Sequence, residues 1–250
     1  MAESSGRRRN APARKAPPRP AATPAGAAPL TQARIVAAAL ALTERDGLSG
    51  LTTRKLGAEL GVEAMSIYHH FPSKRHLLDA LVDHAIASVE FPPPGEPRAR
   101  LRALCYAYRA MAHRYPRLYA LVALHRLNTP TGVRFIEGVL ALIHDIERDA
   151  ERAARHFRAL GYYLLGATLD ETAGYAQGPS AAEPVDDAYV ARACPRLAAA
   201  APYFREREWD ATFALGLDAL FAGFGATTAS ARARRAASPA PRRQPRGARS

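Results

Sequence analysis

The chain has 250 residues, of which 48% are hydrophobic, and its formal net charge at neutral pH is +12. It contains no apolar run of about eighteen residues and opens on a Pro- and Arg-rich stretch, which argues against a membrane or secreted protein. We therefore expect a cytoplasmic protein that does not interact with membranes. Its two cysteines, Cys105 and Cys194, stand alone in helical patterns, so we expect neither a disulfide framework nor a cysteine metal cluster.

The positive charge lies at the two ends of the chain. Residues 1–30 contribute +5 and residues 226–250 contribute +7, so residues 31–225 are formally neutral. Both ends are rich in Ala, Pro, Ser and Arg and poor in large apolar residues, so we predict two disordered basic tails. Their arginines would attract any polyanion, but a specific function must reside in the neutral middle.

Four helices are predicted in residues 31–91, from apolar residues at helical spacing and from capping residues between them. In chain order, their expected spans are 31–47, 52 or 53–60, about 63–70 and 73–89. The second and third helices, joined by a turn at Gly61, have the spacing of a helix-turn-helix, in which the first helix braces the second in the major groove of DNA.

The exposed positions of this motif have the chemistry that DNA contacts need. Thr52 and Thr53 offer hydroxyls and free backbone N–H groups at a helix N-terminus, which suits a phosphate oxygen. Arg54 beside them could reach a base edge or a second phosphate. Ser73 and Lys74 begin the fourth helix with a cap and a cation. The outward face of the third helix presents Ala64, Met65, Ser66, Tyr68 and His69.

The order of residues in this region is specific. It reads Leu51-Thr52-Thr53-Arg54-Lys55-Leu56-Gly57-x-x-Leu60-Gly61-Val62, followed by Ile67-Tyr68-His69-His70-Phe71-Pro72-Ser73-Lys74. This order strongly resembles the signature of the Tet-repressor (TetR/AcrR) family of transcriptional regulators. The resemblance implies an all-α fold: an N-terminal three-helix helix-turn-helix domain in 31–91, joined by the fourth helix to a helical dimerisation and ligand-binding domain in 96–225.

Carried over position by position, the resemblance implies two kinds of DNA contact. The phosphate backbone would be held by Thr52, Thr53, Tyr68 and Lys74. The residues nearest the bases would be Arg54, Ala64, Met65, Ser66 and His69. One departure is Gly57, which stands mid-helix where the family usually has Ala, at a helix-propensity cost of about 1 kcal/mol.

The second domain is expected to be helical throughout, without strands. Its expected helices are 97–114, 117–127, 131–150, 151–177, 187–199 and 206–225. Segments 161–166 and 213–223 resemble the paired helices that build the four-helix dimer interface of the family, and their small and apolar residues suit close helix packing. The resemblance implies a homodimer whose interface includes Leu164, Phe213, Leu217, Leu220 and Phe224. The alternative is that both helices belong to the core of a monomer.

An apolar pocket for an unidentified small-molecule inducer is expected between residues 97–127 and the helices 131–150 and 155–177. The aromatic residues expected near it are Tyr106, Tyr115, Tyr119, Phe135 and Tyr175. The stretch His125-x-x-x-x-Pro130-Thr131 resembles the one in tetracycline-binding repressors whose histidine holds the magnesium of the drug chelate, and Asp170 falls where those proteins have an acidic residue near that metal. The resemblance assigns His125 and Asp170 to the polar end of the pocket, through hydrogen bonds or through a divalent ion that the ligand chelates. No cofactor is expected.

Two other classes of protein compete with a ligand-responsive repressor of double-stranded operator DNA. A helical enzyme could use His125, Asp170 and Glu171, but the sequence lacks a nucleophile elbow, a paired-cysteine zinc site and a His-Glu-x-x-His run. An architectural DNA binder could use the basic tails alone, without sequence specificity. We therefore predict a dimeric transcriptional regulator, not an enzyme, that leaves a palindromic operator when a small molecule binds.

Overall fold

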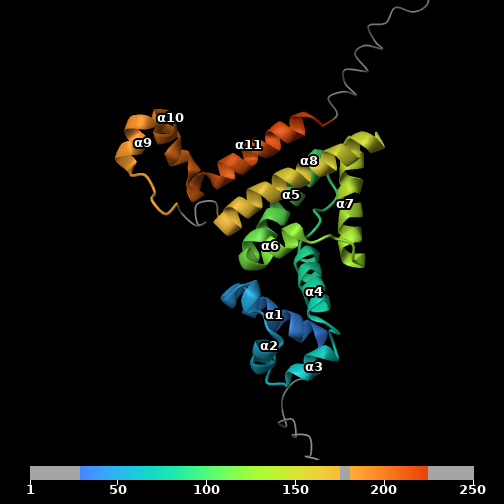
Figure 1. Ribbon diagram of the computed structural model, residues 1–250. Helices are drawn as coiled ribbons and strands as arrows, with labels where there is room; N and C mark the ends of the chain where they lie inside the picture. Colours follow the sequence, from blue (N-terminus) through green and yellow to red (C-terminus); the bar gives the residue numbers. More distant parts are fainter. Residues whose placement is uncertain (1–28, 175–180, 225–250) are drawn as a thin grey trace, which may run out of the picture. The chain divides into compact units, whose positions relative to one another are not determined.

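The computed structural model describes residues 29–174 and 181–224. The predicted basic tails, except for Pro29 and Leu30, and the predicted pocket residue Tyr175 lie outside these residues. All elements described below belong to one unit, which begins at Thr31. Within the described ranges every regular element is a helix, so the predicted all-α fold is confirmed (Figure 1).

The first four helices are bounded by the predicted capping residues. Their bounds are α1 Gln32–Asp46, α2 Thr53–Leu60, α3 Ala64–Tyr68 and α4 Lys74–Ala87, with a 3-10 turn, η1, at Leu48–Gly50. The side chains of Thr31, Thr52 and Ser73 accept hydrogen bonds from backbone N–H groups in the first turns of α1, α2 and α4. The buried core of these helices includes Ile35, Leu42, Leu56, Ile67 and Leu81.

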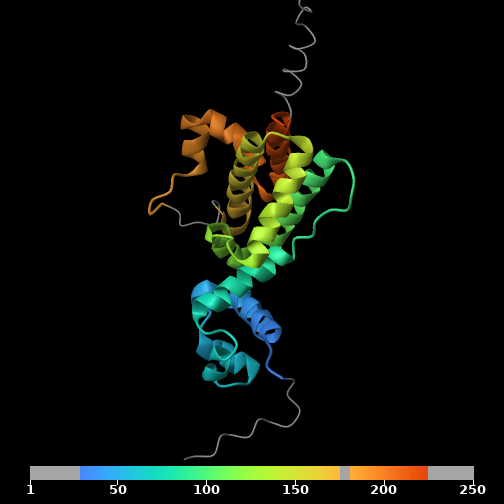
Figure 2. The same ribbon diagram turned by 90° about the vertical axis from the view of Figure 1, so that its right-hand side faces the viewer.

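Four further helices follow, and α4 packs against two of them. Their bounds are α5 Pro97–Arg114, α6 Pro116–Leu124, α7 Pro130–Ile146 and α8 Ala150–Leu169. Figures 1 and 2 show α4 running from α1–α3 to this bundle, where it contacts α6 and α7. Helix α1 also packs against α6, so the first four helices and the bundle share two contact regions.

The C-terminal part departs from the expected helix boundaries. One turn of π-helix, η2 at Asp170–Gly174, ends α8, and the expected helix 187–199 is two helices, α9 Asp187–Ala193 and α10 Pro195–Ala200. The division occurs because Pro195 lacks the backbone N–H that would continue α9. Two 3-10 turns, η4 Ala201–Phe204 and η5 Glu206–Glu208, precede α11 Trp209–Ala222, which lies alongside α8 (Figure 1).

Candidate DNA-binding face and ligand cavity

The turn between α2 and α3 is tight because two glycines shape it. Gly61 has a φ of +69°, in the left-handed region that residues with a Cβ atom seldom adopt. A Cβ atom on Gly57 would lie 2.8 Å from the carbonyl oxygen of Val62 and 3.3 Å from the backbone nitrogen of Ala64. Gly57, a departure with no functional reason in the sequence, therefore allows the first turn of α3 to approach α2.

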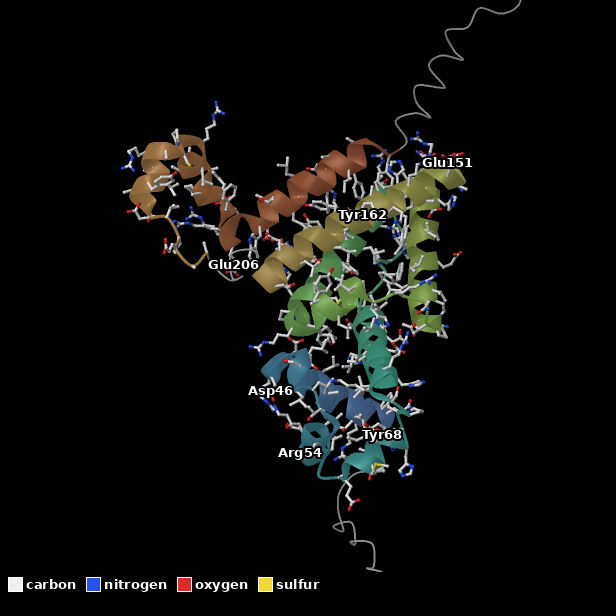
Figure 3. All side chains as sticks on the ribbon, in the orientation of Figure 1. Asp46, Arg54, Tyr68, Glu151, Tyr162 and Glu206 are labelled. Carbon is white, nitrogen blue, oxygen red and sulfur yellow. The ribbon has the colours of Figure 1, made fainter. Side chains whose placement is uncertain are left out.

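The predicted DNA-contacting side chains lie on α2, α3 and the start of α4, and most of them are exposed. Figure 3 labels two of them, Arg54 on α2 and Tyr68 on α3. The exposed residues are Thr52, Arg54, Met65, Tyr68, His69 and Lys74. The half-buried residues are Thr53, Ala64 and Ser66.

The basic residues of this face differ in their partners. The ammonium of Lys74 donates to the carbonyl of Leu51 at 2.8 Å, and the ammonium of Lys55 lies 2.9 Å from Asp46 Oδ2. Arg54 has no such partner within the described ranges. Arg54 is thus the cation on α2 whose donors are available to a base or a phosphate, whereas Lys74 also ties α4 to the loop before α2.

A cavity of about 550 Å³ lies among α5, α6, α7 and α8. This volume is within the range of small-molecule sites, and its walls are mainly apolar. The apolar and aromatic wall comprises Leu101, Leu104, Cys105, Tyr108, Val122, Ala123, Leu127, Val133, Phe135, Ile136, Val139, Phe157, Leu160, Gly161, Tyr162, Leu164 and Leu165. The polar residues are His125, Arg126, Asn128 and Arg158. Of the aromatic residues expected at the pocket, Phe135 lines it, whereas Tyr106, Tyr115 and Tyr119 do not.

A chain of buried hydroxyls connects one wall of the cavity to α6 and α8. Tyr119 donates to the hydroxyl of Tyr108 at 3.3 Å, and the Thr168 hydroxyl lies 2.5 Å from that of Tyr119. Burial raises the pKa of Tyr108 well above its ordinary value and also raises the pKa of Tyr119, so both phenols stay protonated at neutral pH. Tyr108 lines the cavity, and this chain of hydrogen-bonded hydroxyls holds the Tyr108 phenol in place.

His125 lines the cavity and contacts α4, but Asp170 lies elsewhere. The Nε2 atom of His125 is 3.1 Å from Oδ1 of Asp79 on α4. Thr129, which caps the N-terminus of α7, donates a hydrogen bond to Asp83, which also lies on α4. Asp170 is exposed at the start of η2 and does not line the cavity. Within one chain, the structure therefore does not bring together the two residues that the sequence assigns to the polar end of the pocket.

The residues proposed for an alternative enzyme site are also separated. Glu171 is buried beside Arg109, whose Nε atom lies 2.7 Å from Glu171 Oε2, and the same carboxylate oxygen is 2.8 Å from His113 Nε2. Arg109 also bonds to Asp210 at 2.6 Å and lies over the ring of Phe213. This network joins α5, η2 and α11, so the contacts of Glu171 are explained by helix packing.

The outward faces of α8 and α11 differ from the predicted dimer interface. Phe213, Leu217 and Phe224 are buried within the single chain, so the structure places them in its core and not on its outward surface. Leu164 and Leu220 are half-buried. The exposed apolar side chains are Leu215, 71% exposed, and Tyr162, 64% exposed and labelled in Figure 3.

The close approach of α8 and α11 depends on one of the predicted small residues. A Cβ atom on Gly216 would lie 2.3 Å from the ring of Tyr163, whose hydroxyl donates to the carbonyl of Phe213 at 2.8 Å. Gly161 and Gly166, by contrast, face open space within this chain. Gly216 therefore serves packing inside the chain, and the other two glycines do not.

Comparisons with known proteins agree with this architecture. Residues 35–81 match the family model of bacterial regulatory proteins, tetR family, and residues 91–228 match the tetracyclin repressor-like C-terminal domain. The tetracycline repressor protein class A from transposon 1721 of Escherichia coli is 31% identical over 204 residues, which cover 76% of this chain and 88% of that protein.

Two solved structures from Streptomyces coelicolor have the same fold. A possible TetR family transcriptional regulator superposes with a TM-score of 0.64 at 28% identity, covering 77% of this chain and 98% of the other. The TetR family protein ActR, in complex with actinorhodin, gives a TM-score of 0.63 at 27% identity, covering 78% and 97%. The chain belongs to the tetR family of bacterial regulatory proteins, as its helix-turn-helix signature predicts, and it is a DNA-binding transcriptional regulator.

The sequence did not reveal several residues that shape the cavity and its connection to α4. Asp79, Tyr108, Arg126 and Arg158 were not singled out. Arg126 could have been found from its place beside His125, but the pairing of Asp79 with a residue 46 positions away has no local signal.

Among the described residues, no helix combines the length and the apolar composition that a membrane span requires.

Proposed function

We propose that the chain is a homodimeric repressor that binds a palindromic operator and releases it when a small molecule fills the cavity among α5–α8. The observation that carries this proposal is the contact of His125 with Asp79. This contact joins a cavity-lining residue to α4, the helix that follows the proposed DNA-reading helix α3. The operator contacts assigned above to α2, α3 and Lys74 belong to this proposal.

Ligand control requires that the ligand prefers one arrangement of α4. A molecule that binds equally well to the DNA-binding and released conformations would shift nothing, however tightly it bound. A ligand that needs the His125 imidazole must compete with Asp79, and so it favours an arrangement in which α4 is no longer held at this point. The second contact, between Thr129 and Asp83, lies one helical turn further along the same face of α4.

Dimerisation is supported by apolar surface that a single chain leaves uncovered. On α8 and α11 this surface includes Tyr162, Leu215, Ala219, Ala222 and the open position at Gly166. Large apolar side chains are exposed in residues 181–207 as well, and these are Val185, Tyr189, Leu197, Tyr203 and Phe204. Such surface is typical of protein–protein contacts, and a two-fold dimer would present two recognition helices to two half-sites of a palindrome.

The test begins with an operator selected from a random DNA library by the full chain. A symmetric, footprinted site is expected, whereas selection without sequence preference would favour a general DNA binder that acts through its basic tails. The selected operator is then titrated with candidate ligands, of which actinorhodin, the ligand bound to ActR, is a suitable first probe. Because an unsuitable ligand would be uninformative, a panel of aromatic compounds is included. If no compound that occupies the cavity alters operator affinity, the proposed ligand control is wrong.

A further inference from the structure

The polar residues of the cavity are all neutral or cationic. Among the residues that line it, the side chains that can be charged near neutral pH are His125, Arg126 and Arg158, and none is a carboxylate. A cavity of low polarity with only positive groups at its edge attracts negative charge and repels positive charge. The remaining wall is apolar and aromatic, which favours a ligand with flat apolar rings.

Neither of the two guanidinium groups is paired with a carboxylate in the described part of the chain. Arg158 lies 4.8 Å from the ring centre of Tyr162 and donates to its hydroxyl at 2.9 Å. Arg126 is exposed, and no acidic partner is seen for it among the described residues. Arg109 and Arg155, by comparison, pair with Glu171 and Glu151. The positive charge at the cavity therefore remains uncompensated within one chain.

The donors for a metal ion are few. His125 is the only imidazole or carboxylate among the lining residues, and its Nε2 atom is engaged by Asp79. Burial raises the pKa of the Cys105 thiol to about 12, so this residue does not supply a thiolate near neutral pH. The described residues contain no group of three or more His, Cys, Asp or Glu side chains that could hold a metal. Within one chain, the lining therefore offers a ligand-chelated magnesium ion, which the resemblance of His125 implied, a single imidazole or carboxylate donor: the imidazole that Asp79 contacts.

We propose that the cavity binds an aromatic or polycyclic molecule that bears an anionic group, directed to Arg126 or Arg158, and that it does so without a metal ion. This inference rests on the proposed function, because it specifies the ligand of the same cavity. The rings would contact the apolar wall, and a carboxylate, sulfonate or phenolate would accept hydrogen bonds from a guanidinium.

The test compares two fluorescent probes that differ in one charged group: 8-anilinonaphthalene-1-sulfonate, which is anionic, and N-phenyl-1-naphthylamine, which lacks the sulfonate. Both are titrated into the full-length protein in the absence of DNA. We expect the anionic probe to bind about tenfold more tightly, since a hydrogen bond between two charged groups is stronger than one between neutral groups. Arg126→Gln or Arg158→Gln should weaken the anionic probe severalfold without affecting the neutral one.

Two further variants make the result specific to the cavity and to charge. Arg134→Gln removes an exposed arginine of α7 that does not line the cavity, and it should change neither affinity. Gly161 lines the cavity, and its Cβ position is open, so Gly161→Phe should fill the cavity and abolish binding of both probes. Thermal unfolding of each variant shows whether it is folded.

The outcomes separate this inference from the proposed function. Equal affinity for the two probes, or no effect of either arginine variant on the anionic one, would overturn the anionic ligand class. If Gly161→Phe still abolished the binding of both probes, the cavity would remain the ligand site. If both probes bound to folded Gly161→Phe, or if neither probe bound to the wild type, the cavity would not be the ligand site. Addition of Mg²⁺ or EDTA should leave both affinities unchanged, and a tenfold gain with Mg²⁺ that EDTA reverses would contradict the metal-free mode.

Discussion

Nε2 of His125 lies 3.1 Å from Oδ1 of Asp79, which places a cavity-lining imidazole in contact with the helix that begins at Lys74. We predict that Asp79→Asn weakens the coupling between ligand and operator, because an amide oxygen is a weaker partner than a carboxylate for the His125 imidazole, whose contact a ligand must replace. The ligand concentration that releases half of the operator should change at least severalfold, while the anisotropy of the operator complex without ligand changes little. Asp145→Asn, a substitution of another acidic residue of the bundle, is the control. An unchanged release curve for Asp79→Asn would show that this contact is not part of the coupling.

Arg54 is exposed and has no ion-pair partner in the described part of the chain. Arg54→Gln should therefore weaken operator binding by about 1–3 kcal/mol and relax specificity if the residue reads a base. The thermal stability of the Arg54→Gln protein should equal that of the wild type. Arg134→Gln is the matched control, since it removes the same charge from α7. Equal operator affinities for the two variants would remove Arg54 from the DNA interface.

Leu215 and Leu217 lie on opposite faces of α11, one exposed and one fully buried. Leu215→Glu should disrupt the proposed dimer and leave the fold of each chain intact, so light scattering should give the monomer mass and operator affinity should fall. Leu217→Ala should instead lower the free energy of unfolding by about 2–5 kcal/mol, because it leaves a cavity in the core. A Leu215→Glu protein with the dimer mass would place the dimer interface on another surface.

Gly57 allows the backbone of the turn before α3 to lie close to α2. In an exposed helix Gly→Ala stabilises by about 1 kcal/mol, but here the added methyl group meets the backbone of Val62 and Ala64. We predict that Gly57→Ala lowers thermal stability or operator affinity, because α3 must shift. Tighter operator binding and higher stability for Gly57→Ala would contradict this account of the turn.

Cys105 is buried at the cavity wall, and Cys194 is half-buried between α9 and α10. Because burial raises the pKa of Cys105 to about 12, its thiolate fraction at pH 8 is on the order of one in ten thousand. Iodoacetamide should label Cys194 first, as mass spectrometry of the intact chain and its peptides would reveal. The protonated thiol contributes stability that is present below about pH 8.5, the unfolded value, and that is lost as the pH rises toward 12. Rapid labelling of Cys105 at pH 8 would contradict its burial.

The local part of this structure was predictable from the sequence because its signals are local. Thr31, Thr52 and Ser73 cap their helices with their own side chains, and Gly47 and Gly61 have the positive φ values that end or turn a chain. These interactions reach three or four residues along the chain. The order of residues from Leu51 to Lys74 was specific enough to identify the family.

The packing of the second half could not be predicted in the same way. Helix α11 is apolar on several faces, so periodicity could not distinguish the buried Leu217 from the exposed Leu215. The pairs Arg109–Glu171 and His125–Asp79 join residues far apart in the sequence, and neither has a local signature. Asp170 was placed at the pocket by resemblance alone, and one turn of π-helix leaves it exposed.

The most direct test of the central claim is the release of a labelled operator from the full chain, measured by anisotropy, in the wild type and in Gly161→Phe. The account predicts that both proteins bind the operator equally in the absence of ligand, because Gly161 lies in the ligand cavity and not among the DNA-contacting helices. An aromatic acid that releases the wild type should fail to release the variant, whose cavity is filled. Release of both proteins at the same ligand concentration would contradict the claim that this cavity controls DNA binding.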